Sequence, residues 1–447
     1  MMIQSKKESM ILLVGDIVVF IFSLWLSLAL RAGAFPSSEI FFSNLAPFLI
    51  LSIAWVASFF IAGLYEKQKI AQRRRLPELL LKTQLFNSLV AIIFFYFIPY
   101  FGVAPKIILF IYIILSLALS FLWRVYALSN LVSKRREKAM LIAGGNDANE
   151  VLHEINNNPR YPFEITSVIE PDAQSNIDFE KDIVEKMRAE HISIVILDSR
   201  DEKVAPILPH LYDLAFVKIQ FMDFYALYEE LFDRLPVSLL NYSWFLENIS
   251  LAPHTLYDAL KRVMDIVSSI IILTVVAVIC VPVWLILRLE GVKRLWSFQE
   301  RVGQYGKTIR LMKFPSMLFD DGGIWQGKEN KVTKFGAFLR KIRLDEFPQA
   351  WNLLRGDVSL IGPRSEFPNA VGEYTKAISY YNLRYIIKPG LSGWAQIYGE
   401  HPHHGVDIEA TKNKLSYDLF YIKNRSFVLD IIIALKTIKT ILSREGL

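Results

Sequence analysis

The sequence predicts a membrane protein in three parts: an α-helical transmembrane bundle, a Rossmann-like α/β domain, and a mostly α-helical C-terminal domain with a re-entrant membrane helix. Three observations predict this fold class. Hydrophobic residues make up 53% of the 447 residues, and the mean hydropathy is +0.31. The apolar residues gather in long runs, four of them near the N-terminus. Strand-like and helix-like segments then alternate before a further apolar run, which is typical of a parallel sheet.

Residues 1–132 are expected to form four transmembrane helices. Each apolar run is near the roughly 20 residues that span a bilayer, and the last two are somewhat shorter. The runs are Met10–Leu30, Leu45–Leu64, Leu85–Phe101 and Ile107–Leu122. A cleaved signal peptide is not expected, because the first run is long, no small-residue cleavage site stands out, and another membrane run follows.

The distribution of Lys and Arg predicts the orientation of these helices. Lys6 and Lys7 precede the first run, the loop from Ala32 to Asn44 carries no Lys or Arg, and basic residues return in the next long loop and after the fourth run. Basic loops stay in the cytoplasm, so the N-terminus and everything after Val132 are expected there. The net charge is +6, and the Lys and Arg residues cluster next to the membrane runs. This distribution fits binding to anionic lipid headgroups better than binding to nucleic acid.

Residues 133–250 read as a soluble α/β domain with a parallel sheet. The candidate strands are Ala139–Gly145, Ile165–Glu170, Ile192–Asp198 and Val217–Asp223, and Asn149–Asn156 suits a helix. Gly144 and Gly145 lie where a dinucleotide fold keeps its phosphate loop, but the full Gly-x-Gly-x-x-Gly pattern is absent. A scaffold that packs or regulates is therefore favoured over a nucleotide-binding domain.

A second membrane element is expected at about residues 262–288. Pro282 interrupts this apolar segment, and a proline inside a helix removes a hydrogen bond and bends it. Basic residues stand at both ends, with Lys261 and Arg262 before the segment and Arg288 after it. Cations at both ends favour a re-entrant, broken helix that dips into one leaflet. The alternative is a fifth transmembrane helix with a kink. The single cysteine, Cys280, lies in this segment and excludes a disulfide within one chain.

The candidate site lies around two adjacent acids, Asp345 and Glu346, in a frame of basic residues that includes Arg340 and Arg364. Adjacent carboxylates repel and raise each other's pKa unless a cation intervenes. Such a pair can bind Mg²⁺ or divide the roles of nucleophile and base. The arginines suit an anionic substrate, because a guanidinium matches phosphate oxygens. The alternative is a charged helix face with solvated salt bridges.

Two further features add to this region. Pro348 follows the acids closely and is tolerated near a helix start, so a helix beginning around Asp345 would direct its positive end toward anions. A turn with two glycines between Arg301 and Lys307 presents amides and a cation that suit phosphate, although a plain hairpin explains the glycines equally well.

Six segments, taken in order, resemble the bacterial sugar transferase family. They are Phe298-Gln-Glu-Arg-Val-Gly, Leu339-Arg-Lys, Leu344-Asp-Glu-Phe-Pro-Gln, Gly356-Asp-Val-Ser-Leu-Ile-Gly-Pro-Arg, Lys388-Pro-Gly-Leu-Ser-Gly-Trp-Ala-Gln and Tyr417-Asp-Leu-Phe-Tyr-Ile-Lys. The resemblance covers about Lys261 to the C-terminus and implies that residues 251–447 form a monotopic phosphoglycosyl transferase catalytic domain. The four preceding membrane runs and the α/β domain match the large subclass of this family.

The resemblance implies an undecaprenyl-phosphate sugar-phosphotransferase that starts surface-polysaccharide assembly at the bacterial inner membrane. Asp345 matches the nucleophile that attacks the β-phosphate of a UDP-sugar and releases UMP, and undecaprenyl phosphate then accepts the phosphosugar. Glu346 matches the second acid of the dyad, which with Asp345 helps to hold Mg²⁺. Arg340 and Arg364 match phosphate-binding arginines, and Arg301 and Lys307 lie in a loop of the family. The large subclass is compatible with a homodimer.

The chain departs from the family pattern at several positions. Pro315 replaces an Arg, Ser365 replaces a Pro, Val281 precedes Pro282 where a Ser is usual, and Gly291-Val-Lys stands in place of a Gly-Pro segment. None of these changes touches the acid pair. One alternative function is a catalytically inactive membrane protein that senses a nucleotide. A membrane-tethered dehydrogenase or epimerase is a second, but its glycine fingerprint and Tyr-x-x-x-Lys are not found in the α/β domain.

Three features of the C-terminal region leave alternatives open. His401, His403 and His404 crowd one loop, and solvated side chains are favoured there over a metal site. Trp394 suits the membrane interface, a position against the re-entrant helix, or the core. Residues 427–442 are amphipathic and suit either the membrane surface or a terminal core helix.

Overall fold

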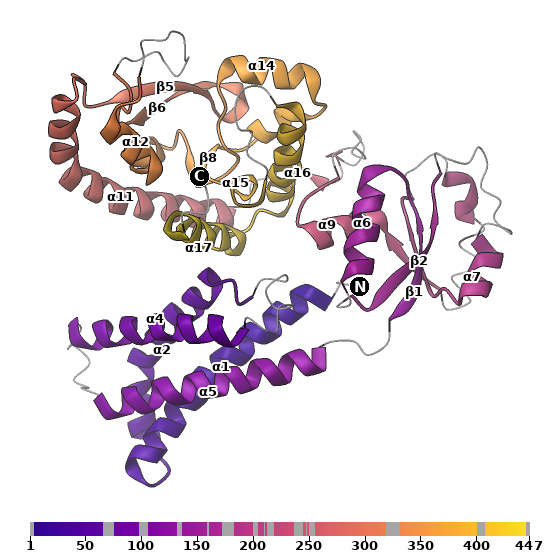
Figure 1. Cartoon of the computed structure of the whole chain (residues 1–447), viewed down its shortest axis with the longest axis horizontal. Helices are drawn as coiled ribbons and strands as arrows, with labels where there is room; N and C mark the ends of the chain where they lie inside the picture. Colours follow the sequence, from indigo (N-terminus) through magenta and orange to yellow (C-terminus); the bar gives the residue numbers. More distant parts are fainter. Residues whose placement is uncertain are drawn as a thin grey trace. The chain divides into compact units, whose positions relative to one another are not determined.

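The computed structural model describes residues 4–65, 76–97, 106–131, 136–158, 161–171, 183–199, 204–209, 211, 219–236, 245–246, 248–249, 255–318, 331–399 and 407–443. The chain divides into two compact units, Met1–Leu231 and Phe232–Leu447. The first contains the N-terminal helices and a parallel sheet, and the second contains the candidate site (Figure 1).

The four N-terminal apolar runs are helical, as expected. They form α1 (Gln4–Ala32), α2 (Ser38–Ile61), α4 (Leu76–Phe97) and α5 (Lys106–Leu131). α1 packs against α5 and α2, and α4 packs against α2 and α5. All four, together with a helix of the second unit, are long and apolar enough to cross a membrane. α4 begins nine residues before the expected Leu85, because Pro77 in its first turn is compatible with a helix start.

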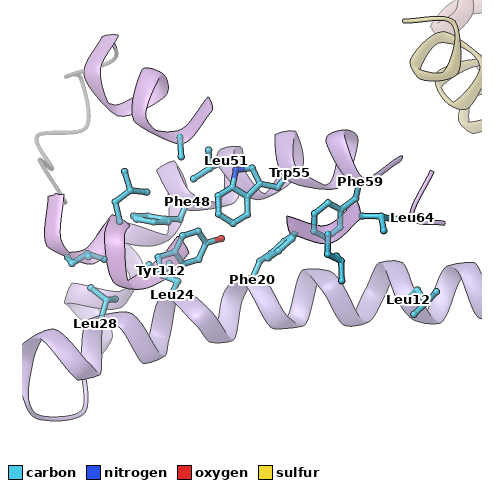
Figure 2. Close-up of a cluster of buried hydrophobic side chains, with 14 of the residues drawn as sticks. Leu12, Phe20, Leu24, Leu28, Phe48, Leu51, Trp55, Phe59, Leu64 and Tyr112 are labelled. Carbon is cyan, nitrogen blue, oxygen red and sulfur yellow. The ribbon is translucent and has the colours of Figure 1, made fainter. Parts of the chain in front are cut away.

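Aromatic side chains fill the interior of this bundle (Figure 2). The Trp55 ring lies 5.4 Å from the Phe20 ring and 5.1 Å from the Tyr112 ring, measured between centroids. Trp55 and Tyr112 are fully buried, whereas apolar side chains such as Ile53 and Phe110 are exposed on the outside. An aromatic interior with an apolar exterior is what a bundle surrounded by lipid requires.

A buried ion pair, which no pattern in the sequence predicts, joins α1 to α5. Arg124 Nη2 lies 2.5 Å from Asp16 Oδ2, and both side chains are almost fully buried. Arg124 also donates to the Leu64 carbonyl at 2.8 Å, and the Tyr65 hydroxyl donates to Asp16 at 2.8 Å. Ionisable groups within membrane helices need such partners, because lipid cannot solvate them.

The remainder of the first unit contains the expected parallel sheet. Its strands are β1 (Glu137–Ile142), β2 (Phe163–Ile169), β3 (Ile194–Leu197) and β4 (Gln220–Asp223), in the order β2-β1-β3-β4. All three pairings are parallel. The associated helices are α6 (Gly145–Asn157), α7 (Lys186–Glu190), the short 3₁₀ helix η3 (Ala205–Ile207) and α9 (Phe224–Phe232). The buried centre of the sheet includes Met140, Ile142 and Val195.

The second unit is mostly helical and is built around the long helix α11 (Thr255–Leu289). The other elements are β5 (Ser297–Val302), η6 (Gln304–Gly306), β6 (Thr308–Lys313), α12 (Lys334–Lys341), η7 (Leu344–Gln349), α13 (Ala350–Arg355), β7 (Ser359–Ile361), α14 (Pro368–Ala377), η8 (Tyr381–Tyr385), β8 (Gly390–Ser392), α15 (Trp394–Tyr398), α16 (Ile408–Asn424) and α17 (Phe427–Ser443). β5 and β6 form an antiparallel hairpin, and β7 and β8 form a parallel pair.

α11 continues through Pro282 as one helix, and its ribbon bends along its length (Figure 1). Its buried residues recur at intervals of four and seven, which defines one face of a helix. They are Asp265, Ser269, Val276, Val283 and Leu287. The opposite face is apolar and exposed, as at Ile271 and Val278. α11 therefore packs one stripe against its own domain and presents apolar side chains on the other side.

The structure answers one of the open alternatives at the C-terminal end and bears on a second. Trp394 is buried, stacks with Phe420 and donates to the Asp233 carbonyl at 2.8 Å, so it packs in the core. α17 buries Asp430 and Ile433 but leaves Val428 exposed, so one of its faces is a core face. His401, His403 and His404 lie outside the described residues.

Candidate active site

The two acids of the candidate site lie on η7, a 3₁₀ helix that starts at Leu344. Arg343, with φ of 54°, adopts the left-handed conformation that commonly follows the end of a helix, and this turns the chain from α12 into η7. The Phe314 amide donates to the Asp345 carbonyl at 2.9 Å and ties η7 to the end of β6. A helical segment begins close to Asp345, as expected. Its first part is the 3₁₀ helix η7, and the α-helix α13 follows from Ala350.

Glu346 is held in its charged form by two cations. Lys313 Nζ donates to Glu346 Oε1 at 2.9 Å, and Arg364 Nη2 lies 3.4 Å from the same oxygen. Burial by itself raises the pKa of a carboxyl, but Arg364 and Lys313 outweigh it and lower the pKa of Glu346 to about 2. Glu346 is therefore an anion at neutral pH.

Asp345 has the opposite environment. Its side chain is buried, and none of the described side chains donates a hydrogen bond to its carboxylate. Burial, with the adjacent Glu346 charge, raises the pKa of Asp345, and this outweighs Lys313 and Arg340. The fold thus separates the pKa values of two neighbouring carboxyl groups, an arrangement that marks acid, base and nucleophile pairs.

Arg340 reaches the site from the last turn of α12. Its Nε donates to Ser316 Oγ at 2.7 Å, so the guanidinium is fixed to the segment after β6. α12 can approach this segment because Gly336 has no side chain. A Cβ at Gly336 would lie 2.3 Å from the Ser316 carbonyl oxygen. The exposed Arg340 therefore has a defined position beside the buried Asp345.

Arg364 follows β7 on a tightly packed loop. Gly362 and Gly390 bring two backbone segments together, since a Cβ at Gly390 would lie 2.1 Å from the Gly362 nitrogen. The Gly390 amide donates to the Pro363 carbonyl at 2.9 Å. Buried Arg384 donates through Nη2 to the Arg364 carbonyl at 3.0 Å and pairs with Asp418 at 2.8 Å. The main chain of Arg364 is thus fixed while its guanidinium meets Glu346.

Arg301 lies next to this arginine, but Lys307 does not. Arg301 is buried, its guanidinium stacks 3.4 Å from the Phe367 ring centroid, and Nη1 donates to the Ser365 carbonyl at 3.4 Å. Burial and the nearby Arg364 lower its pKa to about 10. Lys307 is exposed in the turn between β5 and β6, about 20 Å along the strand from Lys313.

The structure thus brings together Arg301, Arg340, Asp345, Glu346 and Arg364, and it leaves Lys307 and Pro282 elsewhere. Sequence reasoning missed Lys313 as a site residue. The sequence feature that could have identified Lys313 is its position in the segment Lys313-Phe-Pro-Ser-Met317, which matches a family segment except at Pro315. Strand geometry explains the contact, because β6 ends at Lys313 where η7 crosses it.

The acid pair fits a magnesium ion only if substrate phosphates and water supply the remaining ligands. No group of three or more His, Cys, Asp or Glu residues that could hold a metal is found in the described ranges. Mg²⁺ is commonly held by one or two carboxylates and completed by substrate phosphates and water. Asp345 and Glu346 would supply the two carboxylates for such an ion. Together with Lys313, Arg340 and Arg364, they form a cluster of charges whose chemistry suits an anionic phosphate group beside a carboxyl of raised pKa.

Residues 256–444 match the family model described as "Bacterial sugar transferase". In Aeromonas hydrophila, a UDP-N-acetylgalactosamine-undecaprenyl-phosphate N-acetylgalactosaminephosphotransferase is 37% identical over 203 residues, which cover 44% of this chain and 47% of the relative. In Escherichia coli K12, a UDP-glucose:undecaprenyl-phosphate glucose-1-phosphate transferase is 37% identical over 186 residues, covering 40% and 39%.

A shorter relative is matched almost throughout. The uncharacterized sugar transferase EpsL of Bacillus subtilis strain 168 is 34% identical over 190 residues, which cover 42% of this chain and 90% of EpsL. In contrast, the matched stretch spans about half the length of the Aeromonas relative and less than half the length of the Escherichia coli relative. The similarity thus lies in the unit that carries the acid pair.

Proposed function

Because this chain belongs to the bacterial sugar transferase family, we propose that it transfers a sugar-1-phosphate from a UDP-sugar to undecaprenyl phosphate and releases UMP. The observation that carries the proposal is the pair Asp345 and Glu346 within Lys313, Arg340 and Arg364. Relatives whose names specify this reaction match the same unit of the chain. The product would start the assembly of an exopolysaccharide, capsule or O-antigen.

The first chemical step assigns the nucleophile to Asp345. A carboxylate oxygen of Asp345 forms a bond to the β-phosphorus, and the bond from that phosphorus to the bridging oxygen breaks. UMP leaves with the bridging oxygen, and the phosphosugar remains on Asp345 as an acyl phosphate. A carboxylate of raised pKa is a stronger nucleophile once ionised. Burial beside Arg340 and Lys313 supports this role, since both cations favour the ionised form.

The second step returns the enzyme to its starting state. An oxygen of undecaprenyl phosphate attacks the same phosphorus, and the Asp345 carboxylate leaves. The lipid then carries a diphosphate joined to the sugar. Arg340 and Arg364 bind the phosphate oxygens on which charge develops, and Arg301 supports Arg364 from the adjoining strand. Lys313 and Arg364 keep Glu346 ionised at neutral pH, and the Glu346 carboxylate in turn fixes the position of Arg364.

Mg²⁺ bound by Asp345 and Glu346 would neutralise the diphosphate and improve UMP as a leaving group. Lys307 lies in the hairpin turn, away from the acid pair. It could therefore bind only a part of the substrate that is remote from the reacting phosphate.

The lipid acceptor explains the apolar face of α11. Both ends of α11 contact the same domain: Lys261 and Arg262 bind carbonyls there at one end, and Glu290, just after the helix, accepts from the Phe335 amide at 3.0 Å. A straight helix of this length would extend about 50 Å and carry its ends to opposite sides of a bilayer. These contacts support a re-entrant helix bent near Pro282, and the distribution of Lys and Arg along the chain favours the cytoplasmic side of the inner membrane for the site.

The experiment is UMP release from detergent-purified protein with Mg²⁺, undecaprenyl phosphate and a panel of UDP-sugars. One donor is expected to yield UMP, and Asp345→Asn is expected to lower the rate at least about 10³-fold, as for loss of a nucleophile. Asp258→Asn, which removes an exposed acid of α11, is the matched control and should retain the rate. UMP release that survives Asp345→Asn would exclude Asp345 as nucleophile, and folded protein with no UMP from any donor would contradict the reaction.

A further inference from the structure

Three charged residues follow the exposed Asp258 near the start of α11, a helix long and apolar enough to span a membrane. They are Lys261, Arg262 and Asp265. Ionisable residues in such helices are costly unless they have partners, and they often have a function. The proposed reaction does not use any of the three. Their partners are the segments that carry the site.

Lys261 and Asp265 lie one helical turn apart and bind one edge of β7. Lys261 Nζ donates to the Ile361 carbonyl at 2.9 Å. Asp265 Oδ1 accepts from the Leu360 amide at 2.8 Å and from Ser359 Oγ at 3.1 Å. Asp265 and Ser359 are both buried, so these bonds are shielded from water.

The other edge of β7 is bound by β8. Ser359 pairs with Gly390, and Ile361 pairs with Ser392. A strand of three residues is too short to hold its own position, but β7 is bonded on one edge to β8 and on the other to α11. Arg364 lies three residues beyond β7, and its guanidinium meets Glu346 at 3.4 Å. The position of this arginine thus depends on where α11 holds the strand.

Lys261 is itself fixed within a buried cluster. It lies 2.9 Å from Asp430 Oδ2, and the Tyr421 hydroxyl donates to Asp430 Oδ1 at 2.6 Å. The neighbouring Arg262 donates to the carbonyls of Leu353 and Leu354 at the end of α13, the helix that follows the acid pair. The start of the membrane helix therefore contacts the chain on both sides of the candidate site.

From these contacts we infer that Asp265 is a positioning residue, which acts through β7 to place Arg364 against the phosphate of the substrate. Lys261 supports the same strand. The inference rests on the proposed function, because it assigns Asp265 a role in that reaction. It also gives the membrane helix a part in the chemistry besides anchoring, since the turn that enters the apolar segment is bonded to the phosphate-binding loop.

A double-mutant cycle on UMP release tests this inference. Asp265→Ala is expected to lower kcat by about 10- to 100-fold, the loss typical of a misplaced group, with a smaller change in KM. In the Arg364→Ala background, the same change should cost no more than about threefold, because the group it positions is already missing. Asp265→Asn keeps an oxygen that accepts from Leu360 and Ser359, so it should stay within about threefold of the wild type.

Asp258→Ala, an exposed acid of the same helix, is the matched control and should retain the rate in both backgrounds. Should Asp265→Ala fail to fold, Ser359→Ala removes one of the two donors and is expected to give a smaller drop with the same dependence on Arg364. Losses that multiply in the Arg364→Ala background would overturn the inference and leave the proposed function standing. An Arg364→Ala protein with the wild-type rate would instead contradict the proposed role of Arg364 and, with it, the inference.

Discussion

At Asp345, burial and the neighbouring Glu346 charge make the ionised form less favourable in the folded protein than in the unfolded chain. A carboxyl whose pKa is raised on folding destabilises the fold as pH rises through its unfolded pKa near 3.8. Asp345→Asn removes this cost. We expect the variant to unfold at a higher temperature at pH 7, with a gain of roughly 0.5–2 kcal/mol, and to be inactive.

Thermal unfolding of purified protein, followed between pH 7 and pH 4, measures this effect. The gain should shrink as the pH falls toward 4, because part of the carboxyl population is then protonated in the unfolded chain as well. Asp258→Asn should change the unfolding temperature little at any pH. An Asp345→Asn protein less stable than the wild type at pH 7 would mean that Lys313 and Arg340 dominate the environment of Asp345.

Glu346→Gln is expected to act in the opposite direction. Arg364 and Lys313 overcome burial and lower the pKa of Glu346 from 4.5 to about 2, so the charge contributes stability above the unfolded pKa. That contribution is lost as pH falls from about 4.5 toward 2. The substitution leaves two cations without their anion, and we expect a loss of about 1–3 kcal/mol at pH 7.

Chemical denaturation at pH 7 and at about pH 3 separates this effect from a general loss of packing. The difference between wild type and Glu346→Gln should be large at pH 7 and smaller at pH 3. Glu373→Gln, at an exposed acid of α14 that lies 3.8 Å from Lys376, is the matched control and should be within about 0.5 kcal/mol of wild type. An equal loss at both pH values would exclude the charge as its cause.

The acids and arginines of the site could be predicted from the sequence because charged residues crowd a short segment. Lys313 could not, since it lies 33 residues from Glu346 and meets it only where η7 crosses the end of β6. Arg301 was predicted as a phosphate ligand, but the sequence does not indicate that it would be buried against Phe367. Contacts between distant segments depend on the tertiary fold, which local patterns do not encode.

At the scale of elements, α12 holds Arg340 in place through a close approach of Gly336 to Ser316. An alanine in a helix usually stabilises by about 1 kcal/mol over glycine. At Gly336, however, the added Cβ would meet the Ser316 carbonyl oxygen at 2.3 Å and its Cα at 2.7 Å, and main-chain atoms cannot easily move. We therefore expect Gly336→Ala to destabilise by about 1–3 kcal/mol and to lower UMP release, since Arg340 moves with its helix.

Gly372→Ala is the matched comparison. Gly372 lies inside α14, is exposed, and has no atom within 4 Å of an added Cβ. The same substitution should here stabilise by about 0.5–1 kcal/mol and leave activity unchanged. Denaturant unfolding of the two variants side by side measures the contrast. Similar effects at both positions would indicate that α12 does not sit against Ser316 as described.

Element type was predictable where one periodic signal dominates. The four apolar runs and the alternating strands gave helices and a parallel sheet at nearly the expected positions. The sequence does not predict the buried pair of Asp16 and Arg124, because one charge within an apolar run and one just after another run become partners only when α1 and α5 pack together.

At the scale of the whole molecule, the sequence feature that favours a re-entrant helix is the presence of basic residues at both ends of α11. In the structure, Lys261 and Arg262 are not simply solvated topology markers, because both bind carbonyl oxygens of their own domain. The contacts at the two ends of the helix give further support to the proposed re-entrant path. Residues next to both ends of α11 bond to one domain, which a helix crossing the bilayer could not achieve without carrying part of that domain to the other side.

Cysteine accessibility in intact cells tests this topology, and the chain is convenient because Cys280 is its single cysteine. In a Cys280→Ser background, Thr255→Cys lies at the start of α11 and Tyr305→Cys lies in the exposed hairpin turn after it. A membrane-impermeant maleimide is expected to label both only after the inner membrane is opened. Phe35→Cys, at a highly exposed position between α1 and α2, should be labelled from the periplasm without opening and serves as the control. Labelling of Tyr305→Cys from the periplasm, with Thr255→Cys protected, would establish a fifth transmembrane helix and would place the acid pair away from cytoplasmic UDP-sugars.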